Sequence, residues 1–190
     1  MMKNSFGLLI FALLLFSCVQ NYTPKPQAYY RIDFPEREYR MYDSMIPLTF
    51  EYPVYGKVIH IIPPTPDSCW LNIIFPKYKG TIHLSYRKID NNLDQLIEDI
   101  WKGVYSKIAI RADVVDDYPF FIPKQNVYGM IFDIKGNAAS PVQFFVTDSA
   151  KNYLRGSLYF FVKPNHDSLA PVVNFFREDV IHLIETVQWK

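Results

Sequence analysis

The sequence has few cysteines, almost no net charge and no apolar run long enough to span a membrane. Only two of its 190 residues are cysteine, Cys18 and Cys69. If Cys18 is modified, as its context below indicates, Cys69 has no partner and an intramolecular disulfide is excluded. The formal net charge of +1 gives no argument for binding nucleic acid or an anionic membrane surface.

Motifs for catalysis or cofactor binding are also missing. The four histidines are scattered along the chain without the paired spacing of a zinc site. There is no Gly-x-Ser-x-Gly elbow, and residues 136–140 (Gly-Asn-Ala-Ala-Ser) lack the lysine of a phosphate-binding loop. A solvated loop explains the acid pair Asp116-Asp117 better than acid–base chemistry does. We therefore predict that the protein is not an enzyme and holds no cofactor and no metal.

The amino terminus contains an export signal. Lys3 precedes an uncharged apolar run from Phe6 to Phe16, and the run ends at Ser17-Cys18. Such a pattern is typical of a cleaved signal peptide, and the run is shorter than the roughly 20 residues of a transmembrane helix. Leu15-Phe16-Ser17-Cys18 resembles a bacterial lipobox, which implies acylation of the Cys18 thiol. The alternative is an ordinary secretory signal with a chance cysteine.

Three segments follow from this signal. Residues 1–17 are the predicted lipoprotein signal peptide, and residues 18–28 form a lipidated tether that Pro24 and Pro26 keep extended. Residues 29–190 form a single α+β domain, long enough to bury a core. No acid precedes Asp33, which favours a domain that is lipid-anchored in the cell envelope, at the outer membrane and facing the periplasm.

Alternating apolar residues predict an antiparallel sheet. In 81–87, Ile82, Leu84 and Tyr86 alternate with residues of a polar face that includes His83. The short connections between the last three strands are typical of a meander. Residues 29–42 read as an irregular surface segment, and 113–123 receives no element. The predicted strands cover 48–52, 57–62, 69–75, 81–87, 127–134, 141–148 and 153–162.

Two helices are predicted to cover the sheet. The first follows Asn92 as its cap, with Gln95 as capping-box partner, and places Leu96, Ile100, Trp101 and Val104 on one stripe. The second follows Ser168 as its cap, with Pro171 in its first turn. Both faces of the meander are apolar and need cover. The fold class is therefore α+β, an antiparallel β-sheet flanked by two helices, an α/β/α sandwich resembling Mog1/PsbP-type domains.

Several stretches together carry a family resemblance. They include Tyr30-Arg31-Ile32-Asp33, Cys69-Trp70-Leu71-Asn72, the segment from Tyr78 to Tyr86, the segment from Gly136 to Phe144, and Leu154-Arg155-Gly156. From the lipobox to Trp189 the chain resembles the gliding-motility lipoproteins of the GldD family, found in Bacteroidetes. The resemblance implies an envelope lipoprotein needed for gliding and for the associated type IX secretion machinery. It also implies other gliding lipoproteins and membrane components as partners, and it assigns no catalytic residue.

Three functions remain open on the sequence alone. The first is a lipid-anchored, non-enzymatic scaffold that stabilises a motility and secretion assembly. The second is a periplasmic module that binds a small ligand or a peptidoglycan fragment in a pocket beside the sheet. The third is a hydrolase with an unrecognised site. The candidate partner contacts are His83, Asn137 and Arg155.

Overall fold

The computed structural model describes residues 32–44, 46–62 and 68–190. The predicted signal peptide, the tether and Cys18 lie outside these residues, so those assignments stay predictions. Within the described residues the strands are β1 (Tyr39–Tyr42), β2 (Leu48–Pro53), β3 (Lys57–Ile61), β4 (Ser68–Phe75), β5 (Gly80–Lys88), β6 (Ala112–Ile122), β7 (Val127–Gly136), β8 (Val142–Thr147), β9 (Asn152–Phe160) and β10 (Gln188–Trp189). The helices are α2 (Leu93–Lys102) and α3 (His166–Glu185), with single turns η1 (Pro76–Tyr78), η3 (Ala109–Arg111) and η4 (Pro123–Gln125) and a π-helical stretch η2 (Gly103–Ile108).

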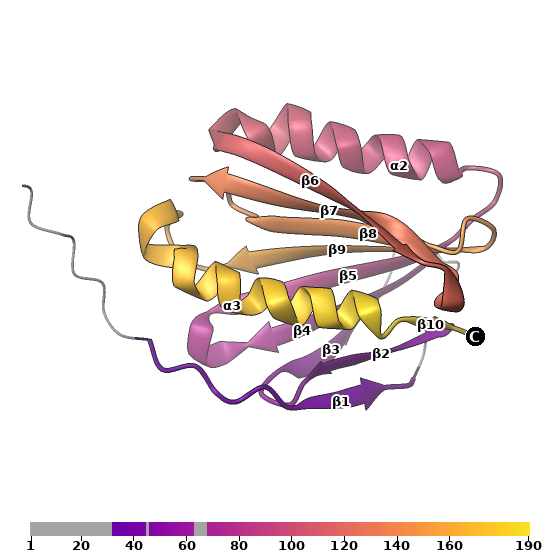
Figure 1. The fold of residues 1–190 in the computed structure, drawn as a ribbon, viewed down its shortest axis with the longest axis horizontal. Coiled ribbons are helices and arrows are strands. Elements are labelled where there is room, and N and C mark those ends of the chain that lie inside the picture. The colour runs from indigo at the N-terminus through magenta and orange to yellow at the C-terminus, as the bar shows by residue number, and fades with distance from the viewer. Residues whose placement is uncertain (1–31, 45, 63–67) are drawn as a thin grey trace, which may run out of the picture. The chain divides into compact units, whose positions relative to one another are not determined.

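Seven strands form one antiparallel sheet in the order β3-β4-β5-β9-β8-β7-β6, and β1-β2-β10 form a smaller sheet. The predicted meander is confirmed, since β7, β8 and β9 are antiparallel neighbours. Helix α2 lies on one face of the large sheet, and α3 with the small sheet lies on the other (Figure 1). The predicted α/β/α sandwich is therefore confirmed, with a second sheet added to one of its layers.

The face of the large sheet that α3 covers carries the larger core. The side chains of Phe50, Phe75, Phe144 and Phe176 are fully buried in it. Gly156 on β9 lies directly opposite Phe144 on β8, and a Cβ atom at Gly156 would come within 2.1 Å of the Phe144 ring. Glycine is required there because the aromatic ring occupies the space of a side chain.

A second, smaller core lies between α2 and the other face of the sheet. Trp101, a member of the predicted stripe, is only partly buried and stacks on Tyr105 with 5.2 Å between ring centroids. The predicted apolar stripe is confirmed at Leu96, Ile100 and Val104, whose side chains are buried in this core. The buried members of this core are Leu96, Ile100, Val104, Phe132, Ile134, Ala138, Phe145 and Tyr153.

The interpretation of residues 29–42 as irregular is wrong in its last part. Tyr39–Tyr42 forms β1, which pairs antiparallel with β2 from Tyr39 opposite Pro53 to Tyr42 opposite Phe50. Strand β2 was expected in the main sheet and instead forms the centre of the small one, between β1 and β10. The Oγ of Thr186, just past α3, accepts a hydrogen bond from the backbone N–H of Glu51 at 2.9 Å, which joins the small sheet to the helix.

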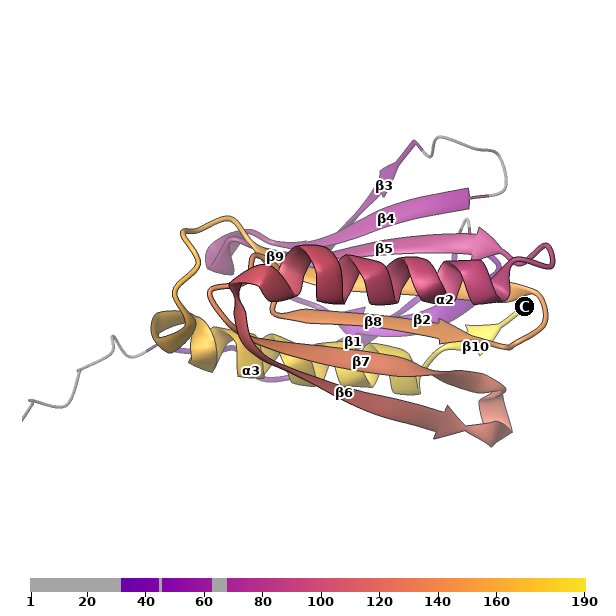
Figure 2. The ribbon, with the colours of Figure 1, turned by 90° about the horizontal axis from the view of Figure 1, so that it is seen from above.

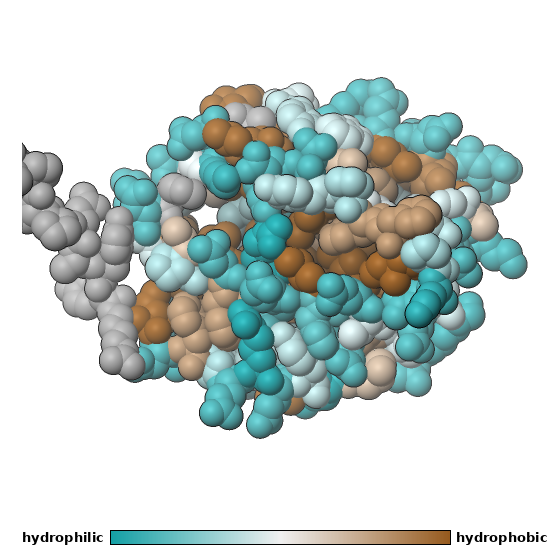
Figure 3. Space-filling model, viewed as in Figure 1, coloured by the Kyte–Doolittle hydropathy of each residue, from teal (hydrophilic) through white to brown (hydrophobic). Residues whose placement is uncertain are grey.

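The sequence pattern also missed β6, which spans Ala112–Ile122. Pro119 lies within this strand, and proline is tolerated there because β6 is at the edge of the sheet. Asp116 forms an ion pair with Lys135 on β7 at 2.7 Å, so the acid pair lies on a strand and not in a loop. Figure 3 shows apolar residues on the surface between β6 and α3. Phe120 and Ile122 of β6 pack on the inner core and stay partly exposed.

Both helix starts differ from the predicted capping. Asn92 precedes α2 but makes no side-chain cap; its Oδ1 accepts a hydrogen bond from the backbone N–H of Asp90. Asn165, not Ser168, caps α3, and its Oδ1 accepts a hydrogen bond from the Ser168 backbone N–H at 3.1 Å. Pro171 therefore lies inside α3 and not in its first turn.

We expect the α2 core to be sensitive to loss of volume at Ile100, which is fully buried. Ile100→Ala removes buried methyl and methylene groups and leaves a cavity, so the free energy of unfolding should fall by about 2–5 kcal/mol. Urea denaturation measures this change. Ile110→Ala, at a side chain 77% exposed, is the matched control and should shift stability by less than about 0.5 kcal/mol. Equal effects of the two substitutions would contradict the placement of α2.

Candidate functional site

Part of the outer face of the large sheet has no helix over it. Helix α2 packs on side chains of β7, β8 and the start of β9. Figure 2 shows that β3, β4 and β5 extend beyond the helix, so their outer face is open. The side chains on this open face are mainly polar, and they include two of the three candidate contacts, His83 and Arg155.

Strand register arranges these side chains in rows. In one row, Asn72 on β4, His83 on β5, Ser157 on β9 and Gln143 on β8 are successive cross-strand partners. Such partners on one face have Cβ atoms only about 4.5–5.5 Å apart. The four side chains therefore form a continuous polar line across the sheet.

The adjacent row, two residues along the strands, contains a tryptophan and an arginine. Trp70 on β4, Ser85 on β5 and Arg155 on β9 are successive partners. Ile61 on the edge strand β3 pairs with Trp70 at the end of this row. The two rows bring indole, imidazole, guanidinium and hydroxyl groups from β4, β5 and β9 to one surface.

A cavity of about 400 Å³ lies between these rows and α2. Its size falls within the range of pockets that hold small ligands. Leu96 and Asp99 from α2 form the helix side of the wall. The sheet side is lined by Ile61, Trp70, Asn72, His83, Leu84, Ser85, Arg87, Tyr153, Arg155 and Ser157.

His83 is neutral at pH 7 in this environment. Burial lowers the pKa of its imidazole from the ordinary value of 6.5. Nδ1 lies 2.8 Å from Oδ1 of Asn72; because the amide oxygen is an acceptor, Nδ1 carries the proton and donates it. Nε2 is then the unprotonated nitrogen and can accept a hydrogen bond.

Arg155 is held by an amide and not by an acid. Its Nη2 donates to Oε1 of Gln143 at 3.0 Å. Among the described residues, no carboxylate lies within ion-pair distance of Arg155 or Arg87. Burial raises the pKa of Tyr153 to about 12, while the positive charges of Arg155 and Arg87 oppose this rise. Both guanidinium groups therefore act on the same end of the cavity.

Asn137, the third candidate contact, lies elsewhere. It is exposed in the connection between β7 and β8, next to Gly136, whose φ of +106° favours glycine. In the same connection Ser140 is fully buried and donates to the backbone carbonyl of Leu158 at 2.9 Å, a structural role. The structure therefore brings His83 and Arg155 together and leaves Asn137 apart.

Sequence reasoning missed the other polar residues of the cavity. Trp70 and Asn72 alternate with the buried Leu71 and Ile73, so the pattern was sufficient to place them on one face. The alternation of apolar and polar residues does not predict which strands are neighbours. It therefore could not show that the polar face of β4 continues onto β5 and β9. Asp99 reaches the cavity only because α2 crosses the sheet beside it.

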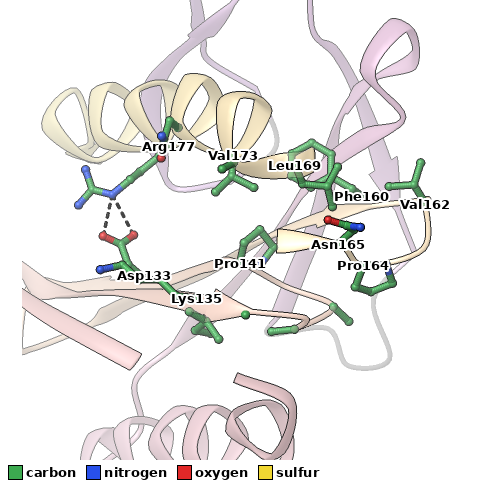
Figure 4. A pocket seen from close by; sticks show the side chains of 16 residues that line it. Asp133, Lys135, Pro141, Phe160, Val162, Pro164, Asn165, Leu169, Val173 and Arg177 are labelled. Carbon is green, nitrogen blue, oxygen red and sulfur yellow. Dashed lines mark hydrogen bonds and ion pairs between the residues drawn. The ribbon is translucent and has the colours of Figure 1, made fainter. Parts of the chain in front are cut away.

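A second cavity, of about 290 Å³, lies between α3 and the ends of β7 and β9 (Figure 4). Its walls are largely apolar, with Phe160 and Val173 among them. Arg177 Nε donates to both carboxylate oxygens of Asp133, at 2.9 and 2.7 Å. Burial raises the pKa of Asp133 even though Arg177 opposes this. The charges in this cavity are thus already paired, in contrast to those of the cavity under α2.

The family profile described as "Gliding motility lipoprotein GldD" matches residues 19–189. The chain belongs to this family. Family membership makes the protein a lipid-anchored envelope protein connected with gliding motility. No curated protein matches the chain. Within the described part of the chain, no helix is long and apolar enough to cross a bilayer.

A similar solved structure is the solution structure of cyanobacterial PsbP (CyanoP) from Synechocystis sp. PCC 6803. The two share 9% sequence identity with a TM-score of 0.50, over 88% of this chain and 100% of that one. At this identity the likeness establishes the PsbP-type fold alone. It agrees with the sandwich topology expected from the sequence.

The environment of His83 predicts a dependence of stability on pH. Because the folded-state pKa is below 6.5, the unfolded chain binds the proton more tightly than the folded protein does. The contribution of neutral His83 is therefore fully present above about pH 6.5 and is lost as the pH falls through the folded-state pKa. The free energy of unfolding of the wild type, measured relative to His83→Gln, should decrease between about pH 7 and pH 5. A difference that stays constant over this range would contradict the prediction.

Proposed function

We propose that this gliding-motility lipoprotein is a non-enzymatic scaffold that stabilises a gliding assembly and the associated type IX secretion machinery. The family match over residues 19–189 carries the proposal. Two buried apolar cores support it, one between the inner face and α3 with the small sheet, and one between α2 and part of the outer face. The proposed partners are other gliding and type IX secretion lipoproteins and membrane components.

The edge strand β3 offers a contact surface for such a partner. Ile59, Ile61 and the following Ile62 are 46%, 38% and 93% exposed. Edge strands with exposed apolar residues are prone to pair with another chain, and clustered exposed apolar residues mark interaction sites. A scaffold that binds through β3 would leave both cores undisturbed.

The proposed location is the outer membrane, with the domain facing the periplasm. Acylation of Cys18 would provide the anchor, and residues 18–28 would separate the domain from the lipid. A single acyl chain gives only marginal membrane binding, so lasting attachment needs the several chains of a mature lipoprotein terminus. Anchoring would also keep the scaffold at high effective concentration near its partners.

A periplasmic ligand-binding module is the second candidate function. The observation in its favour is the cavity of about 400 Å³ under α2, into which polar groups of β4, β5 and β9 converge. The two candidate surfaces meet at Ile61, which belongs to β3 and also lines the cavity, whereas Ile59 does not line it.

The anchor is tested by Cys18→Ala, with Cys69→Ala as the matched control. We expect the Cys18 variant to appear in the soluble fraction, still folded, because the described residues of both cores all follow residue 31. Cells that carry it should not glide. The Cys69 variant should stay in the membrane fraction and support gliding. Membrane fractionation beside a motility assay measures both. A Cys18 variant that stays in the membrane, or a soluble one that supports gliding, would refute the anchored scaffold.

The contact surface is tested by placing a charge on β3. Ile59→Lys should leave the protein folded and abundant, because the side chain is 46% exposed, and should reduce gliding by weakening partner contact. Ile110→Lys, at an exposed side chain of η3 next to β6, which forms the opposite edge of the sheet from β3, should leave gliding intact. Immunoblots establish protein abundance before motility is compared. Normal gliding with Ile59→Lys would rule out β3 as the contact.

A further inference from the structure

We infer that the cavity under α2 binds an organic carboxylate, held by Arg155 and Arg87. This inference goes beyond the scaffold role, which needs no small ligand. It depends on the charges that line the cavity, on the hydrogen-bond donors that lack acceptors, and on the apolar part of the wall.

The charges of the cavity do not balance. Arg87 and Arg155 contribute two positive charges and Asp99 one negative charge, while His83 is neutral because burial lowers its pKa. No described carboxylate forms an ion pair with either arginine. Among the other described arginines, Arg37 and Arg177 have an acidic partner, and Arg40 and Arg111 have none. The cavity therefore lacks one negative charge.

The donors on this face also lack acceptors. Gln143 is 1% exposed; its Oε1 accepts from Arg155, but its amide nitrogen has no hydrogen-bond partner. The indole N–H of Trp70, in the adjacent row, is likewise buried without a partner. A buried donor without an acceptor costs about 1–3 kcal/mol. Trp70 and Arg155 line the cavity, and Gln143 lies outside its wall and contacts it through Arg155. Within the described residues, the indole N–H of Trp70 is thus a cavity-lining donor without an acceptor, and Arg155 has no acidic partner.

A carboxylate fits this site better than a phosphate. The hydrogen bond to Gln143 orients the Arg155 guanidinium, whose planar fork matches two coplanar carboxylate oxygens. Asp99 on the helix side would repel the second charge of a phosphate, whereas one carboxylate brings the charge of the wall to neutrality. Ile61, Leu96 and Tyr153 add apolar surface for the organic part of the ligand.

Two sources supply this chemistry, the carboxyl terminus of a peptide and a free small acid. The test titrates the full chain, purified from membranes in detergent, with N-acetylleucine by isothermal calorimetry. N-acetylleucine amide, which lacks only the negative charge, is the matched probe. Acetyl-Gly-Gly-Leu with a free carboxyl group and acetate distinguish the two sources.

N-acetylleucine should bind with a Kd in about the millimolar range, as expected for so small a ligand, and the amide should bind at least about tenfold more weakly. A peptide that binds more tightly than N-acetylleucine assigns the cavity to a carboxyl terminus. Acetate that binds as tightly as N-acetylleucine assigns it to a free small acid. Equal binding of N-acetylleucine and its amide, or no saturable binding of any probe, overturns the inference.

Arg155→Gln should weaken binding of N-acetylleucine at least about tenfold. Arg111→Gln, at an exposed arginine outside the cavity, is the control and should bind as the wild type does. If circular dichroism shows that Arg155→Gln does not fold, binding is measured with Arg87→Gln instead. Arg87 is exposed, so this variant should fold, and Arg87 lines the cavity, so its loss should also weaken binding. Wild-type affinity in the folded variant would overturn the inference. Gliding is not the readout, so this result is independent of the scaffold proposal.

Discussion

One buried carboxylate connects the small sheet to α3. Asp179 is fully buried and accepts hydrogen bonds from the hydroxyls of Tyr39 at 2.9 Å and Tyr55 at 2.6 Å, with Arg37 Nε at 3.8 Å. Burial raises the pKa of Asp179, and these partners oppose the rise. They come from the segment before β1, from β1 and from the turn before β3. Asp179 thus connects three points of the amino-terminal part of the domain to the helix that covers the inner face, and Glu51 adds a second connection through Thr186 and His182.

This arrangement determines which face of the sheet remains open. A helix about 10 Å wide covers only two or three strands spaced about 4.8 Å apart. On the inner face α3 shares the cover with the small sheet, and together they bury side chains of β4, β5, β7, β8 and β9. On the outer face, no further element of the described residues adds to the cover that α2 provides. The polar rows of β4, β5 and β9 are open because no second element within residues 32–44, 46–62 and 68–190 lies over them.

Local pattern predicted the elements whose side chains alternate strictly and missed those held by distant contacts. In β5, Ile82 and Leu84 are buried and His83 lies on the opposite face, as expected. Strand β1 forms because of its pairing with β2 and the bond from Tyr39 to Asp179, 140 residues away. The sequence pattern did not predict β6, because acidic residues and Pro119 interrupt its alternation. Proline is tolerated in this strand because β6 is at the edge of the sheet. Edge position and long-range pairing are properties of the whole fold.

The cavity was predictable only in part for the same reason. Alternation put His83 on the polar face of one strand and Arg155 on a polar face of another, but only the β5–β9 pairing makes them neighbours. Their environment does not favour stability: among the described residues, Arg155 has no acidic partner and the buried amide nitrogen of Gln143 has no acceptor. Sequences that otherwise satisfy the rules of packing break them mainly at functional sites. The unsatisfied groups under α2, rather than the well-paired Asp133 and Arg177 of the other cavity, therefore mark the part of the domain that is shaped by binding.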